Sequence, residues 1–159
     1  MAVLTTALKT IAVLMCSLLL AAIVGSIGSI FLEVLLPRFF SALLPYALWL
    51  VIGIYCGLLS FGGAGAWASG HASPWGWRGK IPETQGEGDW ITRPGAKRIG
   101  TTVAIVGMIV IVPLGVLFHL ISHDGHSLTF FVSVMIGMIL GRWSLMPDDS
   151  ARLSGNPIR

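Results

Sequence analysis

Three histidines, His119, His123 and His126, lie close together in one short segment of the chain. His119 and His123 are four residues apart, which places them on one face of a helix, and His126 joins that face if the helix continues for another turn. With Asp124 and Glu33 they offer ligand types that zinc and copper accept. The Asp-Gly pair after His123 favours ending the helix there, however, and an isolated HxxxH pair matches no established metal motif. A zinc or copper site is therefore an alternative hypothesis, and the main interpretation predicts no cofactor.

The sequence lacks the other residue patterns that would indicate catalysis. Ser122, His123 and Asp124 are consecutive, so their side chains cannot converge as those of a catalytic triad do, and no GxSxG motif accompanies them. Gly79 and Lys80 are followed by isoleucine instead of Ser or Thr, so they do not form a phosphate-binding loop. We therefore predict that the protein is not an enzyme.

Four long apolar runs dominate the chain, and they must position any site. The runs cover residues 11–32, 39–61, 101–121 and 128–143, and each is close to the roughly 20 residues that a helix needs to cross a bilayer. Hydrophobic residues make up 55% of the 159 residues and charged residues only 11%, which is unusual for a protein with a water-facing surface. The prediction is an all-α integral membrane protein, a four-helix transmembrane bundle of two helical hairpins that forms a single membrane domain over residues 1–159.

The basic residues predict the orientation of these spans. When the four runs cross the membrane alternately, all but one of the ten Lys and Arg residues fall on one side, together with the loop 62–100 and the tail 144–159. These residues are Lys9, Arg78, Lys80, Arg93, Lys97, Arg98, Arg142, Arg152 and Arg159, and the exception is Arg38. Because cytoplasmic flanks carry the excess of positive charge, we expect the chain in the cell (inner) membrane with both termini in the cytoplasm. Orientation and contact with anionic lipid account for the net charge of +3, so no nucleic-acid partner is predicted.

Small residues recur four positions apart in three of the predicted spans. The series are Ala21, Gly25 and Ser29; Gly53 and Gly57; and Ser133, Gly137 and Gly141. Such stripes let helix backbones approach closely, and van der Waals contact of this kind is a main source of helix association in lipid. We therefore predict these eight residues as helix-packing positions. The stripes serve either the bundle itself or a partner, which would be another membrane subunit or a second copy of the chain.

The predicted cytoplasmic loop, residues 62–100, is rich in Gly, Pro and Trp. Its many helix breakers predict no regular helix of useful length. It carries Trp67, Trp75, Trp77 and Trp90, interleaved with Arg78, Lys80, Arg93, Lys97 and Arg98. Aromatic and basic residues together favour the headgroup layer of a bilayer. These nine residues are predicted to bind the membrane surface or to dock a protein partner.

The two cysteines, Cys16 and Cys56, both lie about five residues from the cytoplasmic ends of their predicted spans. They are expected at a similar depth in the membrane. We interpret them as small apolar side chains, with a redox pair as the alternative.

Three classes of function are compatible with these features. The first is a non-catalytic small subunit or accessory factor of a larger membrane assembly, which acts by helix packing and through the cytoplasmic loop. The second is a small oligomeric transporter or channel, although the spans offer few of the polar or ionisable residues that a permeation path normally needs. The third is a metal-handling membrane protein built on His119, His123 and His126. The sequence favours the first class.

Overall fold

The computed structural model describes residues 1–35, 38–70 and 95–145, and these residues form four α-helices and no strand. The helices are α1 (Ala2–Leu35), α2 (Arg38–Ser69), α3 (Ala96–Ser122) and α4 (Gly125–Leu145). Each is long and apolar enough to cross a membrane. The predicted all-helical fold with four candidate spans is confirmed, and it is consistent with a multi-pass membrane protein.

The helices are longer than the apolar runs suggested. α2 continues to Ser69 and α3 begins at Ala96, so the prediction that residues 62–100 contain no regular helix is wrong at both ends of that segment. The glycines that predicted a break, Gly62, Gly63 and Gly65, are buried within α2. The low helix propensity of glycine is overridden where a smooth helix surface permits close packing.

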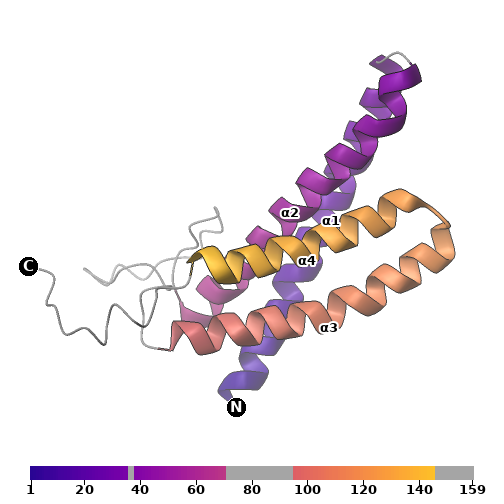
Figure 1. The fold of residues 1–159 in the computed structure, drawn as a ribbon. Coiled ribbons are helices and arrows are strands. Elements are labelled where there is room, and N and C mark those ends of the chain that lie inside the picture. Colours follow the sequence, from indigo (N-terminus) through magenta and orange to yellow (C-terminus); the bar gives the residue numbers. More distant parts are fainter. Residues whose placement is uncertain (36–37, 71–94, 146–159) are drawn as a thin grey trace, which may run out of the picture.

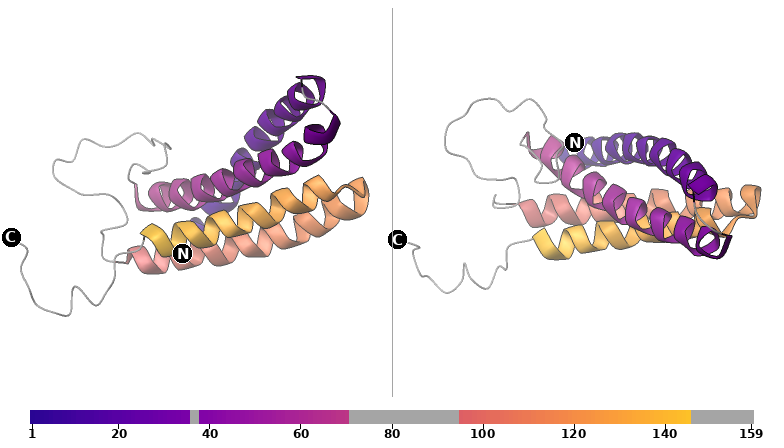
Figure 2. Two further views of the ribbon diagram at one scale, coloured as in Figure 1. Left: turned by 45° about the horizontal axis from the view of Figure 1, so that its top comes forward. Right: turned by 90° about the horizontal axis from the view of Figure 1, so that it is seen from above.

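Helix α1 packs against α2 and α3 packs against α4, and these two pairs of helices contact each other mainly through α2 and α4. α3 and α4 lie side by side, and α2 runs along α4, where the packing is most extensive (Figures 1 and 2). α1 crosses the bundle beside α2 and also touches α3. Toward the connection between α1 and α2 these two helices diverge from α3 and α4 (Figure 1). The last buried residue of α1 is accordingly Gly25, and none follows it as far as Leu35.

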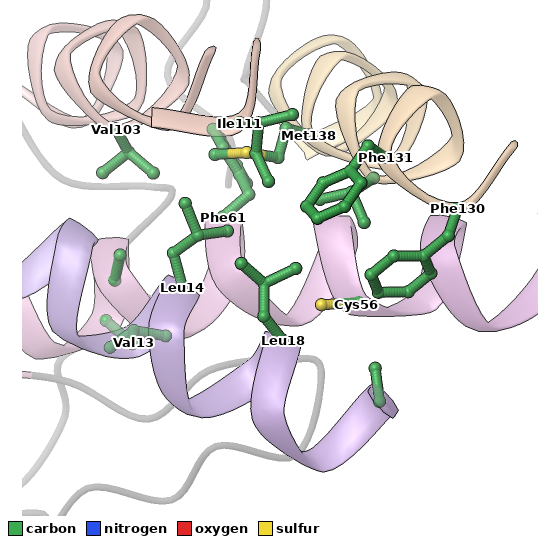
Figure 3. Packing of buried hydrophobic residues seen from close by; sticks show 14 of the residues in the cluster. Val13, Leu14, Leu18, Cys56, Phe61, Val103, Ile111, Phe130, Phe131 and Met138 are labelled. Carbon is green, nitrogen blue, oxygen red and sulfur yellow. The ribbon is translucent and has the colours of Figure 1, made fainter. Parts of the chain in front are cut away.

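The core lies where all four helices meet. Leu14 of α1, Phe61 of α2, Ile111 of α3 and Met138 of α4 are fully buried there (Figure 3). No acidic, basic or histidine side chain is buried in residues 1–35, 42–70 and 95–143, for which burial is described. In these ranges the buried polar side chains are Thr10, Ser17, Ser60 and Ser133, and each donates its hydroxyl hydrogen to the carbonyl oxygen four residues earlier in its own helix. The hydroxyls of these four buried residues are therefore all hydrogen-bonded within their own helices.

Candidate functional site

The closest helix contact joins α2 and α4 and is made of small residues. A Cβ atom placed on Gly53 would lie 2.6 Å from Cβ of Ser133. One placed on Gly57 would lie 2.9 Å from the backbone carbon of Gly137, and one on Gly137 would lie 2.9 Å from the backbone carbonyl carbon of Ile54. Real Cβ atoms do not approach other atoms so closely, so backbone meets backbone here and neither helix can accept a larger side chain without moving.

Two other small residues of the predicted stripes receive large side chains from α2. A Cβ atom on Gly25 would overlap the indole ring of Trp49, and one on Gly141 would lie 3.0 Å from the ring of Phe61. Ala21 is buried in the same face of α1, whereas the hydroxyl oxygen of Ser29 is buried with no hydrogen-bond partner in the described part of the chain. The stripe on α1 thus contacts α2 at Gly25, and the packing continues at Gly28, where an added Cβ atom would lie 2.8 Å from Cδ2 of Leu48.

The sequence reasoning missed a fourth set of small residues on α3. A Cβ atom on Gly107 would collide with the thioether of Met138, and one on Gly115 would lie 3.0 Å from Cβ of Phe131. Ala104, like these glycines, is buried. Ala96, Gly100 and Ala104 repeat at four-residue spacing, and this series could have indicated close packing in the first half of α3, although it does not include Gly107 or Gly115.

The stripes of α2 and α4 are therefore occupied within the chain itself. Gly53, Gly57, Ser133, Gly137 and Gly141 all face side chains or backbone of another helix of the same molecule. A partner protein that binds this fold must use a different surface.

The predicted cytoplasmic ends of α1 and α2 are joined by Lys9 and Trp67. The Lys9 ammonium donates a hydrogen bond to the carbonyl oxygen of Trp67 at 3.0 Å, and its nitrogen lies 5.6 Å from the centre of the indole ring. Trp67 lies in the last turns of α2 and not in an irregular loop, and 47% of its surface is exposed. At the same end of the bundle Arg142 of α4 donates to the hydroxyl of Thr101 of α3 at 3.4 Å.

Two more of the predicted surface residues, Lys97 and Arg98, are exposed in the first turn of α3. The other predicted binding residues of this region lie outside the described residues: Trp75, Trp77, Arg78, Lys80, Trp90 and Arg93. Their role in docking stays a prediction from the sequence.

The opposite end of α3 and α4 carries the histidines. His123 ends α3 with a positive φ of 50°, and its backbone N–H donates to the carbonyl oxygen of His119 at 3.0 Å. Asp124 caps α4 by accepting the backbone N–H of His126 at 2.9 Å. The His126 ring packs on Tyr46 of α2 with 4.0 Å between ring centres.

These contacts do not bring the histidines together as metal ligands. Over residues 1–35, 38–70 and 95–145 no three His, Cys, Asp or Glu side chains lie close enough to hold one metal ion. His126 would join the face of His119 and His123 only if the helix continued past Asp124 and Gly125; α3 ends at Ser122, as the Asp-Gly pair indicated, and His126 belongs to α4. Glu33, the other possible ligand, is exposed near the end of α1.

The two cysteines occupy different environments. Cys16 is exposed on the outward side of α1, whereas Cys56 is buried in the core, and both thiols are free. They do not form a shared site in this structure.

One cavity of about 340 Å³ lies between the two helix pairs, near the histidine end. Apolar side chains from all four helices line it, including Ala22 of α1, Trp49 of α2, Phe118 of α3 and Phe130 of α4. Its polar lining consists of Asp124, His126 and Ser127, which lie together at the start of α4. The cavity is thus apolar along most of its length and polar at one end.

The chain matches no protein-family model, and comparison with curated proteins and with solved structures gave no significant match. Its function is therefore argued from its own residues.

Proposed function

We propose that the protein is a non-catalytic subunit or accessory factor of a larger membrane protein assembly. In this proposal the bundle is a scaffold held together by small residues, and it presents an apolar helix face and a Trp-rich cytoplasmic segment to another membrane protein. Residues 71–94 of that segment lie outside the described structure, so their contribution rests on composition alone.

The observation that carries the proposal is the core of the bundle, which holds no buried charged side chain where the structure describes side-chain burial. The buried hydroxyls of Thr10, Ser17, Ser60 and Ser133 bond to their own helices, so they offer no continuous polar path for a solute. A permeation path or a catalytic centre in hydrocarbon normally needs polar or ionisable side chains along its length. In the described cavity such groups, Asp124, His126 and Ser127, lie only at the end beside the junction of α3 and α4. This interior suits a protein that acts by binding.

The exposed face of α1 after Gly25 supports binding of a partner within the membrane, although Gly28 on another face of this segment still packs against Leu48 of α2. Between Gly25 and Leu35 this helix has no buried residue, and Ile27, Ile30, Phe31 and Val34 are each more than half exposed. These exposed side chains of α1 can contact either lipid or a partner helix. It replaces the small-residue stripes as the proposed partner surface, because those of α2 and α4 are already filled from within the chain.

In the proposed orientation the protein lies in the inner membrane of the cell, and the Lys9 end of the bundle faces the cytoplasm. Lys9, Lys97, Arg98 and Arg142 all lie at this end, and the bond from Lys9 to α2 and the bond between Arg142 and Thr101 join its helix termini. Excess positive charge at one end favours the cytoplasmic side.

A small oligomeric transporter is the second candidate, and the cavity between the helix pairs favours it. The cavity is lined almost entirely by apolar groups and lies toward one end of the bundle, which suits a hydrophobic molecule better than a hydrated ion. Metal handling is less well supported, because no three potential ligands meet within the described ranges.

Co-purification in mild detergent tests the proposal. We expect the double variant Trp75→Ala/Trp77→Ala to lose a partner protein that the unaltered chain recovers, since the tryptophans supply large contact surfaces. The matched double variant His119→Ala/His123→Ala should recover the partner normally and support normal cellular function. The reverse pattern, together with stoichiometric zinc or copper in the purified protein, would overturn the proposal.

A further inference from the structure

The lining of the cavity between the helix pairs is apolar along its body and polar at one end, which matches the two parts of an amphiphilic molecule. Leu18 and Leu19 of α1 and Leu114 of α3 line its apolar body, whereas Asp124, His126 and Ser127 form its polar end. That polar end lies at the junction of α3 and α4, opposite the Lys9 end of the bundle. In a membrane-spanning bundle the junction lies at the interface, so the cavity extends from the headgroup level into the hydrocarbon.

The size of the cavity matches one hydrocarbon chain and not a whole diacyl lipid. At 340 Å³ it is a little over twice the ~150 Å³ apolar cavity that holds a benzene molecule, so it has room for about a dozen carbon atoms. An apolar cavity in contact with lipid stays dry, so hydrocarbon is the material that fills it. The neighbouring lipid supplies such chains directly.

The polar end combines groups that are already bonded within the chain with one that is not. The Ser127 hydroxyl donates to the carbonyl oxygen of Asp124 at 2.8 Å, and Asp124 Oδ1 accepts the backbone N–H of His126. His126 Nδ1 is buried and has no hydrogen-bond partner in the described part of the chain. His126 Nε2 lies 4.0 Å from the Asp124 carboxylate, which is too far for a hydrogen bond. Asp124 is about half exposed, so its carboxylate can accept hydrogen bonds from a ligand and attracts a positive group.

We propose that this cavity binds one acyl chain of a membrane phospholipid, whose ammonium-bearing headgroup lies beside Asp124 and His126. The second acyl chain stays in the bilayer. The bound lipid joins the two helix pairs where their own side chains do not meet, and it completes the packing between α1 and α3. This inference is independent of the proposed partner, because it rests on the cavity alone.

The test measures phospholipid retained by the purified full-length chain after exchange into detergent micelles that contain phosphatidylethanolamine or phosphatidylglycerol. We expect one tightly held phosphatidylethanolamine per chain, detected by native mass spectrometry. Ala22→Phe places a ring in the cavity and should lower retention by roughly ten-fold, since the chain and the ring compete for one volume. Ala12→Phe, at an exposed position of α1 away from the cavity, is the matched control and should retain the lipid.

Two further variants separate lipid loss from misfolding and locate the headgroup. Leu19→Trp fills the cavity from another position and should behave like Ala22→Phe, while circular dichroism checks that both variants keep the helix content of the control. Asp124→Asn keeps an oxygen to cap α4 but removes the charge, so it should abolish the preference for phosphatidylethanolamine over phosphatidylglycerol. Unchanged retention in both folded filling variants, absence of bound lipid in the unaltered chain, or an unchanged headgroup preference in Asp124→Asn would overturn the proposal.

Discussion

The glycines at the helix contacts of this protein act by having no side chain. Gly57 and Gly137 allow the backbones of α2 and α4 to touch, and Gly25 provides the space that the Trp49 ring fills. In lipid such contacts carry much of the association energy, because apolar side chains gain nothing by leaving lipid for protein. The stability of the bundle should therefore be most sensitive to added volume at these positions.

Replacing Gly57 by leucine should destabilise the bundle by at least about 2 kcal/mol, because the new side chain has no space against α4. The matched control is Ala47→Leu, an exposed position on the same helix that should change stability by less than about 0.5 kcal/mol. Equilibrium unfolding in mixed micelles measures both values. Equal stability of the two variants would refute close packing at Gly57.

Residue spacing predicted part of this packing and missed the rest. The GxxxG pair in the second span and the repeat in the fourth pointed to Gly53, Gly57 and Gly137, which lie in one helix contact. Gly107 and Gly115 were not identified, because they are eight residues apart and their role depends on Met138 and Phe131 of another helix. Spacing within one helix shows where a backbone can approach, but not which side chain of another helix enters the space.

At the scale of the elements, hydropathy predicted that four helices exist but not where they end. α2 continues through Gly62, Gly63 and Gly65 to Ser69, because burial of this smooth segment outweighs its low helix propensity. The alternative of a histidine metal site depended on a continued helix. The turn at His123 and Asp124 begins a new helix, so residues that would share one face of a longer helix belong to two helices.

The continuation of α2 is testable by amide hydrogen exchange in micelles. The amides of residues 63–69 should exchange as slowly as those of the preceding turns, because they are hydrogen-bonded in a buried helix. The amides of Ala2 to Leu4 at the frayed start of α1 serve as the fast-exchanging reference, since the first turn of a helix has no intrahelical acceptors. Fast exchange throughout residues 63–69 would show that this segment is a loop, as the sequence predicted, and not part of α2.

At the scale of the whole molecule, helix length and membrane thickness constrain the arrangement. α1 has 34 residues and is about 51 Å long, whereas α4 has 21 and is about 31 Å long, against a hydrocarbon core of roughly 30 Å. Longer helices fit a bilayer by tilting or by extending beyond it. The divergence of α1 and α2 from α3 and α4 lets long and short helices share one membrane (Figure 1).

The proposed orientation predicts the result of cysteine labelling in intact cells. In a chain whose Cys16 and Cys56 are replaced by alanine, a cysteine at Ser122 should react with an impermeant maleimide added outside the inner membrane. A cysteine at Gln85 should react only after the membrane is permeabilised, since the charge distribution places it in the cytoplasm. Labelling of position 85 in sealed cells would show that the topology is the reverse of the proposed one.

We propose that a partner protein binds at the outward face of α1, and site-specific photocrosslinking in the native membrane tests this most directly. A benzophenone amino acid is placed at Ile27, which is 55% exposed, and for comparison at Ile109 of α3, which is 66% exposed. We expect Ile27 to give a discrete crosslink to a different polypeptide, while Ile109 gives crosslinks to lipid alone. Crosslinks from Ile27 to lipid alone, or to a second copy of this chain alone, would contradict this proposal.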